Sequence, residues 1–228
     1  MEGQQKLCNN MSYLSLDFLK DNFLNQKIVF FDIGCCNLWD TKDFVSVLPD
    51  ATFYAFEPLK DYYDINLVRS VEYGVNFFNY AISDVDGDIL FYPSEKQGQQ
   101  QQLQSSSIFK PTIHNVVSYG EPYMVKSVTI ESFCSEHNIS PDFIHIDVEG
   151  AEYNVFIGLG KHRPKGIWVE MIGYRYYQNG RSDRYDIENI DYELDRLLQS
   201  YGYESVFQSD NDSLYLHKDA NLKTRQYV

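Results

Sequence analysis

Short apolar runs alternate along this chain with segments of helical periodicity, and this alternation limits the folds open to it. The runs are KIVFFDIG from Lys27, ATFYAFEP from Ala51, VNFFNYAISD from Val75, DFIHID from Asp142 and GIWVEM from Gly166. Runs of this length and composition predict strands that are buried on both faces of a sheet. Strands that alternate with helices form a mainly parallel sheet. We therefore predict an α/β fold, a twisted parallel sheet with helices on both faces.

The end of the chain predicts a different element. A stripe of apolar residues from Ile187 to Tyr201 has helical spacing and ends before Gly202. YESVFQ and SLYLH then predict a C-terminal antiparallel β-hairpin. No repeat or domain boundary is evident, so we predict a single domain over 1–228. It has an N-terminal extension over 1–25 and an insert over 85–126, which holds a flexible glutamine-rich loop.

The charge balance narrows the possible partners. The formal net charge is −14. A surface this acidic repels phosphate backbones and anionic lipids, so we expect no nucleic-acid partner and no membrane insertion. The polar N-terminus lacks the apolar core of a signal peptide, and no run of about 18 apolar residues is present. Four cysteines without a C-x-x-C spacing argue against structural zinc or a disulfide framework. We expect a cytoplasmic protein.

The carboxyl ends of the predicted strands carry the residues that indicate a ligand. The first strand ends at Asp32 and Gly34, and the second ends at Glu57, roughly twenty residues after the glycine, where a carboxylate can accept both ribose hydroxyls. The G-x-G-x-x-G pattern for a pyrophosphate is missing. S-adenosylmethionine contains adenosine without phosphate, and its positive groups suit an acidic pocket. Asp32 could hold its amino group.

The ordered set of segments resembles the FkbM-type methyltransferases. The segments are VFFDIGCCN, FYAFEP, NYAISDVDGDILFY, SSSIF, VKSVTIESF, DFIHIDVEGAEYNVFIGLG and GIWVEM, between Ile28 and Met171. The resemblance implies a class I Rossmann-like S-adenosylmethionine domain. It also implies O-methylation, often of sugars or glycosylated natural products. One departure is the first turn, where Cys35 to Leu38 stand and the family's usual second glycine is lost.

The resemblance assigns site residues position by position. Asp32 and Gly34 match the cofactor turn, Glu57 matches the ribose acid, and Ala81 and Ser83 match the adenine side. With neighbours in the same segments, the predicted cofactor-binding residues are Asp32, Gly34, Cys35, Cys36, Asn37, Glu57, Pro58, Ala81, Ile82 and Ser83. The two thiols either touch the cofactor or only fill the turn.

Three acids at strand ends are the predicted catalytic residues: Asp147, Glu149 and Glu170. Methyl transfer to a hydroxyl needs the acceptor oxygen held in line and its proton accepted. We favour a general base or hydrogen-bond acceptor. A divalent metal held by these oxygens is possible but not favoured, and positioning of the cofactor is the third option. Glu152 fits a helix dipole better than catalysis, and His145 fits a hydrogen-bonded core position better than a base.

Two segments are candidates for the walls of the acceptor site. One is the insert from Gln97 to Tyr123, in which His114 is a weak candidate for a base. The other is GYRYYQNGR after the fifth strand, where the tyrosines could stack on sugar faces, Arg175 could meet an anion, or the cluster could simply pack on the domain.

The sequence thus predicts an S-adenosylmethionine-dependent O-methyltransferase that acts on a hydroxyl of a sugar, glycan or glycosylated metabolite. The alternatives are an NAD-linked oxidoreductase and a non-catalytic nucleoside-binding module on a Rossmann-like fold. Neither the acceptor nor the oligomeric state can be read from the residues.

Overall fold

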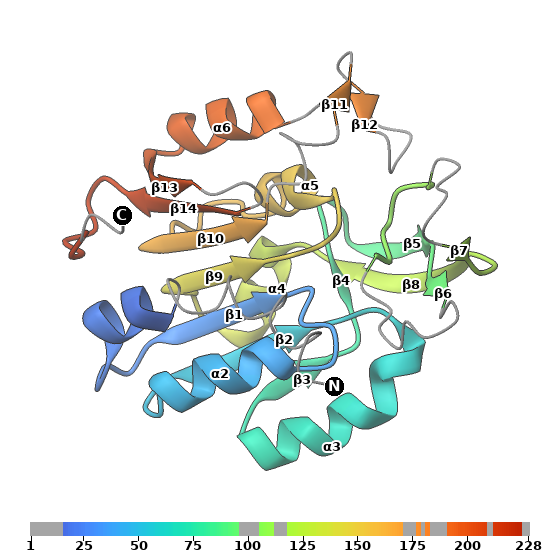
Figure 1. The fold of residues 1–228 in the computed structure, drawn as a ribbon, viewed down its shortest axis with the longest axis horizontal. Coiled ribbons are helices and arrows are strands. Elements are labelled where there is room, and N and C mark those ends of the chain that lie inside the picture. The colour runs from blue at the N-terminus through green and yellow to red at the C-terminus, as the bar shows by residue number, and fades with distance from the viewer. Residues whose placement is uncertain are drawn as a thin grey trace, which may run out of the picture.

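The computed structural model describes residues 16–95, 105–111, 118–170, 177–178, 181–182, 191–208 and 212–224 (Figure 1). Several predictions fall outside these residues. They are the start of the N-terminal extension, most of the glutamine-rich loop, His114, and Tyr174 to Tyr176.

A seven-stranded sheet forms the centre of the molecule, in the order β13-β14-β10-β9-β1-β2-β3. The strands are β1 (Val29–Ile33), β2 (Thr52–Phe56), β3 (Asn76–Phe78), β9 (Phe143–Ile146), β10 (Gly166–Glu170), β13 (Tyr203–Gln208) and β14 (Asp212–His217). The first five pair in parallel, whereas β14 runs antiparallel to both β10 and β13. This arrangement confirms the predicted fold class, including the terminal hairpin.

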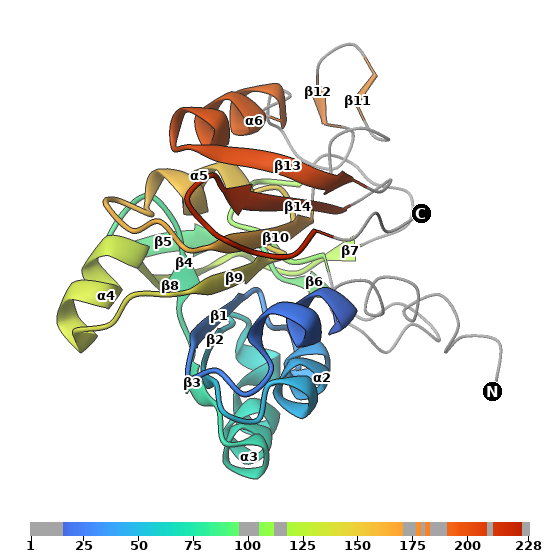
Figure 2. The same cartoon turned by 90° about the vertical axis from the view of Figure 1, so that its left-hand side faces the viewer.

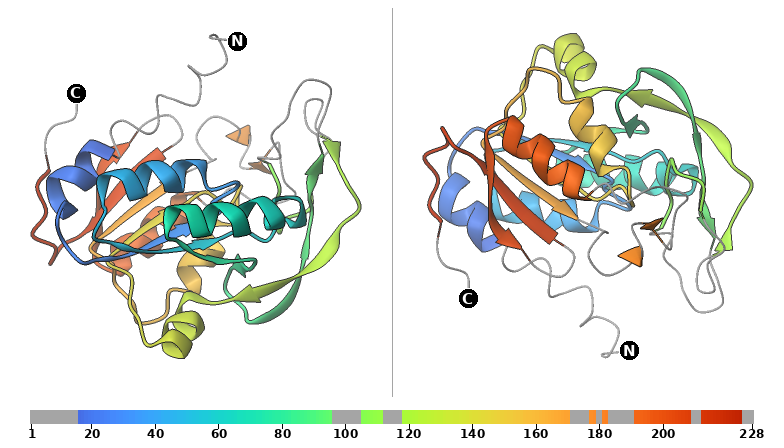
Figure 3. Two further views of the ribbon diagram at one scale, coloured as in Figure 1. Left: turned by 90° about the horizontal axis from the view of Figure 1, so that it is seen from below. Right: turned by 90° about the horizontal axis from the view of Figure 1, so that it is seen from above.

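Helices cover both faces of this sheet (Figure 3). They are residues 16–23, α2 (Trp39–Val47), the 3₁₀ turn η1 (Lys60–Tyr62), α3 (Tyr63–Tyr73), α4 (Ile130–His137), α5 (Glu152–Ile157) and α6 (Asp191–Ser200). Helix 16–23 and α2 pack on one face, and α4, α5 and α6 pack on the other. No helix in the described part of the chain is long and apolar enough to cross a membrane.

Strand periodicity divides the buried side chains between the two faces. On β1, Phe30 points to the core under α2, while Phe31 points to the core under α4. Phe30 stacks on Phe143 of the neighbouring strand with 5.3 Å between ring centroids. On the other face, Phe133 of α4 packs edge-on against Phe31. Side chains that alternate across a strand thus fill two cores, as a doubly covered sheet requires.

The predicted strand from Val75 to Asp84 is in fact two strands. β3 belongs to the central sheet, but β4 (Ala81–Ile82) pairs with β8 (Tyr123–Val128) in a separate three-stranded sheet that also contains β5 (Gly87–Phe91). The chain leaves the central sheet at Asn79, whose Nδ2 donates to the carbonyl oxygen of Glu57 at 2.6 Å. A run of apolar residues does not reveal such a change of pairing partner.

The described parts of the insert lie beside the carboxyl ends of the parallel strands (Figures 1 and 2). They contain β5, β8 and the small pair β6 (Ser94–Glu95) and β7 (Ser118–Tyr119). A second small pair, β11 (Tyr177–Gln178) and β12 (Arg181–Ser182), follows β10 in the chain. The arrowheads of β1, β9 and β10 point toward the insert, so it borders the edge where parallel sheets bind ligands.

Candidate cofactor and acceptor site

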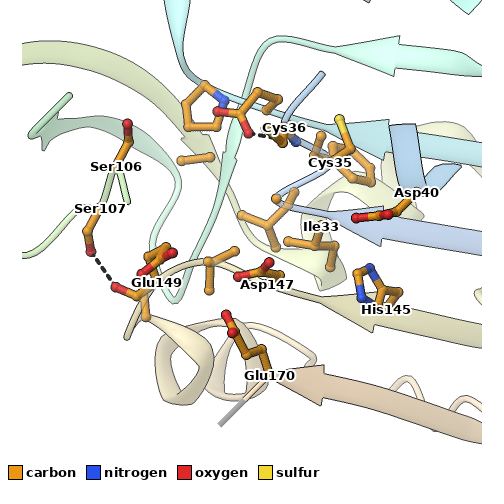
Figure 4. Close-up of a pocket in the computed structure, with 18 of the residues that line it drawn as sticks. Ile33, Cys35, Cys36, Asp40, Ser106, Ser107, His145, Asp147, Glu149 and Glu170 are labelled. Carbon is orange, nitrogen blue, oxygen red and sulfur yellow. Dashed lines mark hydrogen bonds between the residues drawn. The ribbon is translucent and has the colours of Figure 1, made fainter. Parts of the chain in front are cut away.

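A cavity of about 300 Å³ opens at the carboxyl ends of β1, β2, β9 and β10 (Figure 4). Its walls come from these strand ends, from α2 and from the segment 105–111. The lining includes most of the predicted site residues, namely Gly34, Cys35, Cys36, Asn37, Glu57, Pro58, Ala81, Ile82, Asp147, Glu149 and Glu170. Residues more than a hundred positions apart thus share one pocket.

Gly34 allows β1 and β9 to approach each other where they end. Its backbone has φ +83°, and a Cβ placed on it would lie 1.7 Å from the carbonyl oxygen of Asp147. Its N–H donates to the carbonyl oxygen of Phe56 at 2.9 Å. A side chain at position 34 would therefore separate the strands that carry the two halves of the site.

The turn after Gly34 is stabilised by α3 and Glu57 instead of by a second glycine. Cys36 has φ +49°, in the left-handed region. Its N–H donates to Glu57 Oε2 at 3.0 Å, and its carbonyl oxygen accepts from Asn66 Nδ2 at 2.7 Å. Arg69 Nη1 donates to the carbonyl oxygen of Asn37 at 2.6 Å. These contacts hold a conformation that a glycine would otherwise allow.

The thiols of this turn are neutral wall groups. Burial, followed by the charge of Asp32, raises the pKa of Cys35. Burial and then the charge of Glu57 raise the pKa of Cys36 to about 12. Because the thiolate is the nucleophilic form, neither cysteine is poised to react. Their contribution to a ligand site is shape.

Glu57 lies in the cavity wall with both carboxylate oxygens hydrogen-bonded to the backbone. It is 8% exposed, and its Oε1 accepts from the N–H of Leu59 at 2.8 Å. Burial raises its pKa to about 7, against the lowering effect of the hydrogen bonds from Leu59 and Cys36. Each carboxylate oxygen keeps a further lone pair for a hydroxyl. Apolar groups adjoin it in the cavity wall, namely Pro58, Tyr80, Ala81, Ile82 and Phe91.

Two predicted cofactor residues do not line the cavity. Asp32 is 1% exposed, because it points toward α2, where Thr41 donates to Oδ2 and His145 Nδ1 lies 2.9 Å from Oδ1. Ser83 is also 1% exposed, and its hydroxyl donates to Asp84 Oδ1 at 2.9 Å. The structure therefore does not support direct contact between a ligand in the cavity and either residue.

The three predicted catalytic acids come together at one side of the cavity. Asp147, Glu149 and Glu170 each offer an oxygen within 4.8 Å of the others. Figure 4 shows Asp147 and Glu170 extending toward each other. Burial, followed by the charge of Glu170, raises the pKa of Asp147 well above its usual range. Like charges at this spacing favour either a shared proton or a shared cation.

The segment 105–111 is attached to the turn that carries these acids. Glu149 has φ +54°, unusual for a residue with a side chain. Its carbonyl oxygen accepts from Ser107 Oγ at 2.9 Å (Figure 4). Ser107 also exchanges backbone hydrogen bonds with Tyr92, at 2.8 and 3.1 Å. Ser106 and Ile108 line the cavity on this side. The acids and the insert therefore form one wall.

Glu152 has a structural role, but it acts through hydrogen bonds to the turn before α5 and not through the helix dipole that the sequence favours. It is 5% exposed at the start of α5, and its Oε1 accepts from the N–H of Gly150 at 3.1 Å and from that of Val148 at 3.3 Å. Burial raises its pKa to about 8, against these hydrogen bonds. It stabilises the turn that precedes α5 and does not line the cavity.

His145 combines a core position with a place in the cavity wall. It is 8% exposed, and its ring packs edge-on against Phe44 with centroids 5.1 Å apart. Burial lowers its pKa, but the hydrogen bond and charge of Asp32, with Asp40 and Asp212, outweigh this and raise it overall. The hydrogen-bonded core histidine that the sequence favours is thus confirmed, and it also faces a ligand space.

Sequence reasoning missed part of the wall on the α2 side. The missed residues are Trp39, Asp40, Asp43, Phe44 and Trp168. Asp40 is the acid in the first turn of the helix that follows Gly34, and this position was a readable signal. Trp168 lies inside an apolar strand, and nothing in the sequence signals that it lines the cavity.

The chain matches known proteins in both sequence and fold. Residues 36–205 match the Methyltransferase FkbM domain. The 2-O-methyltransferase NoeI of Sinorhizobium fredii is 31% identical over 165 residues, and the match covers 66% of this chain and 65% of NoeI. This chain therefore matches slightly less than two thirds of its curated relative's length.

Among solved structures, the Methyltransferase FkbM of Methylobacillus flagellatus aligns with a TM-score of 0.49 at 12% identity, over 84% of this chain and 44% of that one. The 1,6-didemethyltoxoflavin-N1-methyltransferase of Burkholderia thailandensis, solved with S-adenosylhomocysteine, aligns with a TM-score of 0.47 at 10% identity, over 96% and 83% of the two chains.

Proposed function

Because the chain belongs to the FkbM methyltransferase family, we propose that it is an S-adenosylmethionine-dependent O-methyltransferase acting on a hydroxyl of a sugar, glycan or glycosylated metabolite. The observation that carries the proposal is the single cavity in which a ribose-type acid, Glu57, and three clustered acids meet. The name of the relative, a 2-O-methyltransferase, supports oxygen as the acceptor atom.

The charge of the cavity supports this cofactor over a dinucleotide. The lining carries six carboxylates, namely Asp40, Asp43, Glu57, Asp147, Glu149 and Glu170. No lysine or arginine is found among the described lining residues. A pyrophosphate would be repelled here, whereas a sulfonium and an ammonium group would be attracted. This argues against the NAD-linked alternative.

The residues that would hold the cofactor fit its parts. Glu57 would accept the ribose hydroxyls, and the turn from Gly34 to Asn37, which lines the cavity, would lie beside the ligand. The apolar groups beside Pro58 would pack on the adenine. When bound, S-adenosylmethionine supplies an electrophilic methyl group on a positively charged sulfur.

The chain's part in the reaction is to orient a hydroxyl and remove its proton. Asp147, with Glu170 beside it, is our candidate for the proton acceptor, because burial and the charge of Glu170 raise its pKa and make it a stronger base than an ordinary carboxylate. Glu149 lies next to the segment 105–111 and would orient the acceptor. In this scheme the clustered oxygens, which lie within 4.8 Å of one another, hold a proton in place of a metal ion.

The same acids suit a hydroxyl-rich acceptor. Carboxylates accept hydrogen bonds, and a sugar presents several donors. An acceptor with phosphate or carboxylate groups near the reacting hydroxyl would be repelled by the six acids of the lining. We therefore expect neutral sugars to be better acceptors than sugar phosphates.

Calorimetric titration with S-adenosylhomocysteine tests the cofactor assignment. Wild type should bind, Glu57→Ala should bind at least about tenfold more weakly because charged hydrogen bonds are lost, and the exposed control Glu72→Ala should match wild type. NAD should not bind. Absence of S-adenosylhomocysteine binding to wild type would overturn the proposal and favour a protein without this activity.

A mass-spectrometric screen tests the acceptor class. Purified protein, S-adenosylmethionine and neutral sugars or glycosides should give products heavier by one methylene group. A deoxysugar that lacks the modified hydroxyl should give none. Methylation confined to nitrogen or carbon acceptors would overturn the O-methyltransferase assignment while leaving the cofactor assignment intact.

A further inference from the structure

The cavity contains one basic side chain among many acids. His145 is the only described lining residue that can carry a positive charge, and it faces a lining with six carboxylates. The amino-acid end of S-adenosylmethionine brings a carboxylate as well as an ammonium group. Acids can hold the ammonium and the sulfonium, but they repel the carboxylate. A carboxylate in this cavity therefore needs a specific donor.

The surroundings of His145 hold its ring in one orientation. His145 lies on β9 opposite Asp32 of β1 in the sheet register, and its Nδ1 is 2.9 Å from Asp32 Oδ1. Asp32 is itself held by Thr41 of α2, and Phe44 packs against the imidazole. With Nδ1 engaged behind the cavity wall, Nε2 is the ring nitrogen that remains for a ligand.

Acids on several elements favour the form of the ring that donates from both nitrogens. Asp32 on β1, Asp40 on α2 and Asp212 on β14 all act on His145 electrostatically. Asp147 lies two residues further along the chain, directly after β9, and all of these groups are carboxyls. The imidazole is thus the natural counter-charge for an anion at the α2 side of the cavity (Figure 4).

We propose that His145 binds the carboxylate of the amino-acid end of the cofactor, through Nε2, with Asp32 and Thr41 as positioning residues. This inference rests on the proposed function. It makes His145 a specificity residue that separates S-adenosylmethionine from analogues without the carboxylate. A purely structural histidine would stabilise the fold without making that distinction.

The test compares two ligands on three proteins. S-adenosylhomocysteine has the amino-acid end, and 5′-methylthioadenosine lacks it. Calorimetry on wild type, His145→Gln and the exposed control His137→Gln should show a loss of about tenfold or more for S-adenosylhomocysteine only in His145→Gln. The affinity for 5′-methylthioadenosine should change less than about twofold, since no contact to it is removed.

Each result is decisive for one of the two proposals. Equal losses for both ligands in His145→Gln would overturn the inference, because they indicate a structural role. No binding of either ligand to wild type would overturn the proposed function instead. If His145→Gln fails to fold, the binding of decarboxylated S-adenosylhomocysteine to wild type is measured in its place. Affinity equal to that of S-adenosylhomocysteine would overturn the inference, and weaker binding would support it.

Discussion

Gly34 and Asp147 meet so closely that a single added carbon at Gly34 would overlap the carbonyl oxygen of Asp147, at 1.7 Å. The two residues directly follow the neighbouring parallel strands β1 and β9, and Asp147 N donates to the carbonyl oxygen of Ile33 at 2.9 Å. One residue begins the cofactor turn and the other belongs to the acid cluster. Their contact therefore sets the spacing between the two halves of the proposed site.

Substitution of Gly34 should damage both stability and binding. Gly34→Ala meets backbone atoms and a positive φ, so the free energy of unfolding should fall by more than about 3 kcal/mol. Gly74→Ala is a matched control, since Gly74 also has a positive φ but nothing within 4 Å of the added carbon. Its cost should be about 1–2 kcal/mol. Urea unfolding measures the free energy of unfolding of both variants. Equal losses in the two would contradict the close contact at Gly34.

The affinity for S-adenosylhomocysteine should rise with pH through the titration of Glu57. The pKa of this group is about 7 in the free protein. Ribose hydroxyls bind the ionised carboxylate, so ligand binding must expel the proton below that pH. Calorimetry from about pH 6 to about pH 8 should show the rise in wild type and a flatter profile in Glu57→Gln. Identical profiles would remove Glu57 from the ribose contact.

Asp147→Asn should lower kcat by about 10²–10⁴-fold, because the proposed proton acceptor is lost. Binding of S-adenosylhomocysteine should persist, and the exposed control Asp50→Asn should behave as wild type. Treatment with EDTA should not change the wild-type rate, since proton acceptance needs no metal. A rate that disappears with EDTA and returns with Mg²⁺ would contradict the base assignment.

The Glu170→Gln variant tests the partnership between Glu170 and Asp147. The charge of Glu170 helps to raise the pKa of Asp147, so its removal should lower that pKa. A base works when deprotonated, and the acidic limb of the kcat profile should therefore move to lower pH. A limb that stays in place, or that moves to higher pH, would show that the charge of Glu170 does not raise the pKa of Asp147.

Glu152 should affect stability and not catalysis. Its folded-state pKa is raised from 4.5 to about 8, so its contribution to stability is greatest below pH 4.5 and is lost as the pH rises through 8. Glu152→Gln keeps the acceptor oxygen and should gain stability over wild type at alkaline pH. Glu152→Ala leaves two N–H groups unpaired and should cost about 1–3 kcal/mol. Thermal unfolding across pH separates the two variants, and parallel curves for Glu152→Gln and wild type would refute the raised pKa of Glu152.

The local pattern of the chain was enough to predict the sheet and much of the site. Apolar runs and helical spacing are short-range signals, and parallel strands must bring their carboxyl ends to one edge. Hence the strand pattern alone could place Gly34, Glu57, Asp147 and Glu170 together, since these residues end four different strands or follow them.

Tertiary contacts decided the rest. Asp32 could be predicted at a strand end, but strand alternation turns it toward α2, where Thr41 and His145 engage both carboxylate oxygens. The missing second glycine is offset by Asn66 and Arg69, thirty or more residues away.

The same holds for the insert and for the predicted third strand. Ser107 attaches the insert to Glu149 across 42 positions. The chain leaves the central sheet after β3, and β4 pairs with β8 in a separate sheet. Sequence alone determined which elements form and which of their ends meet, because periodicity and strand direction are local properties. Only the tertiary structure decided which side chains face the cavity and which are engaged behind it, because that choice depends on hydrogen-bond partners far away in the chain.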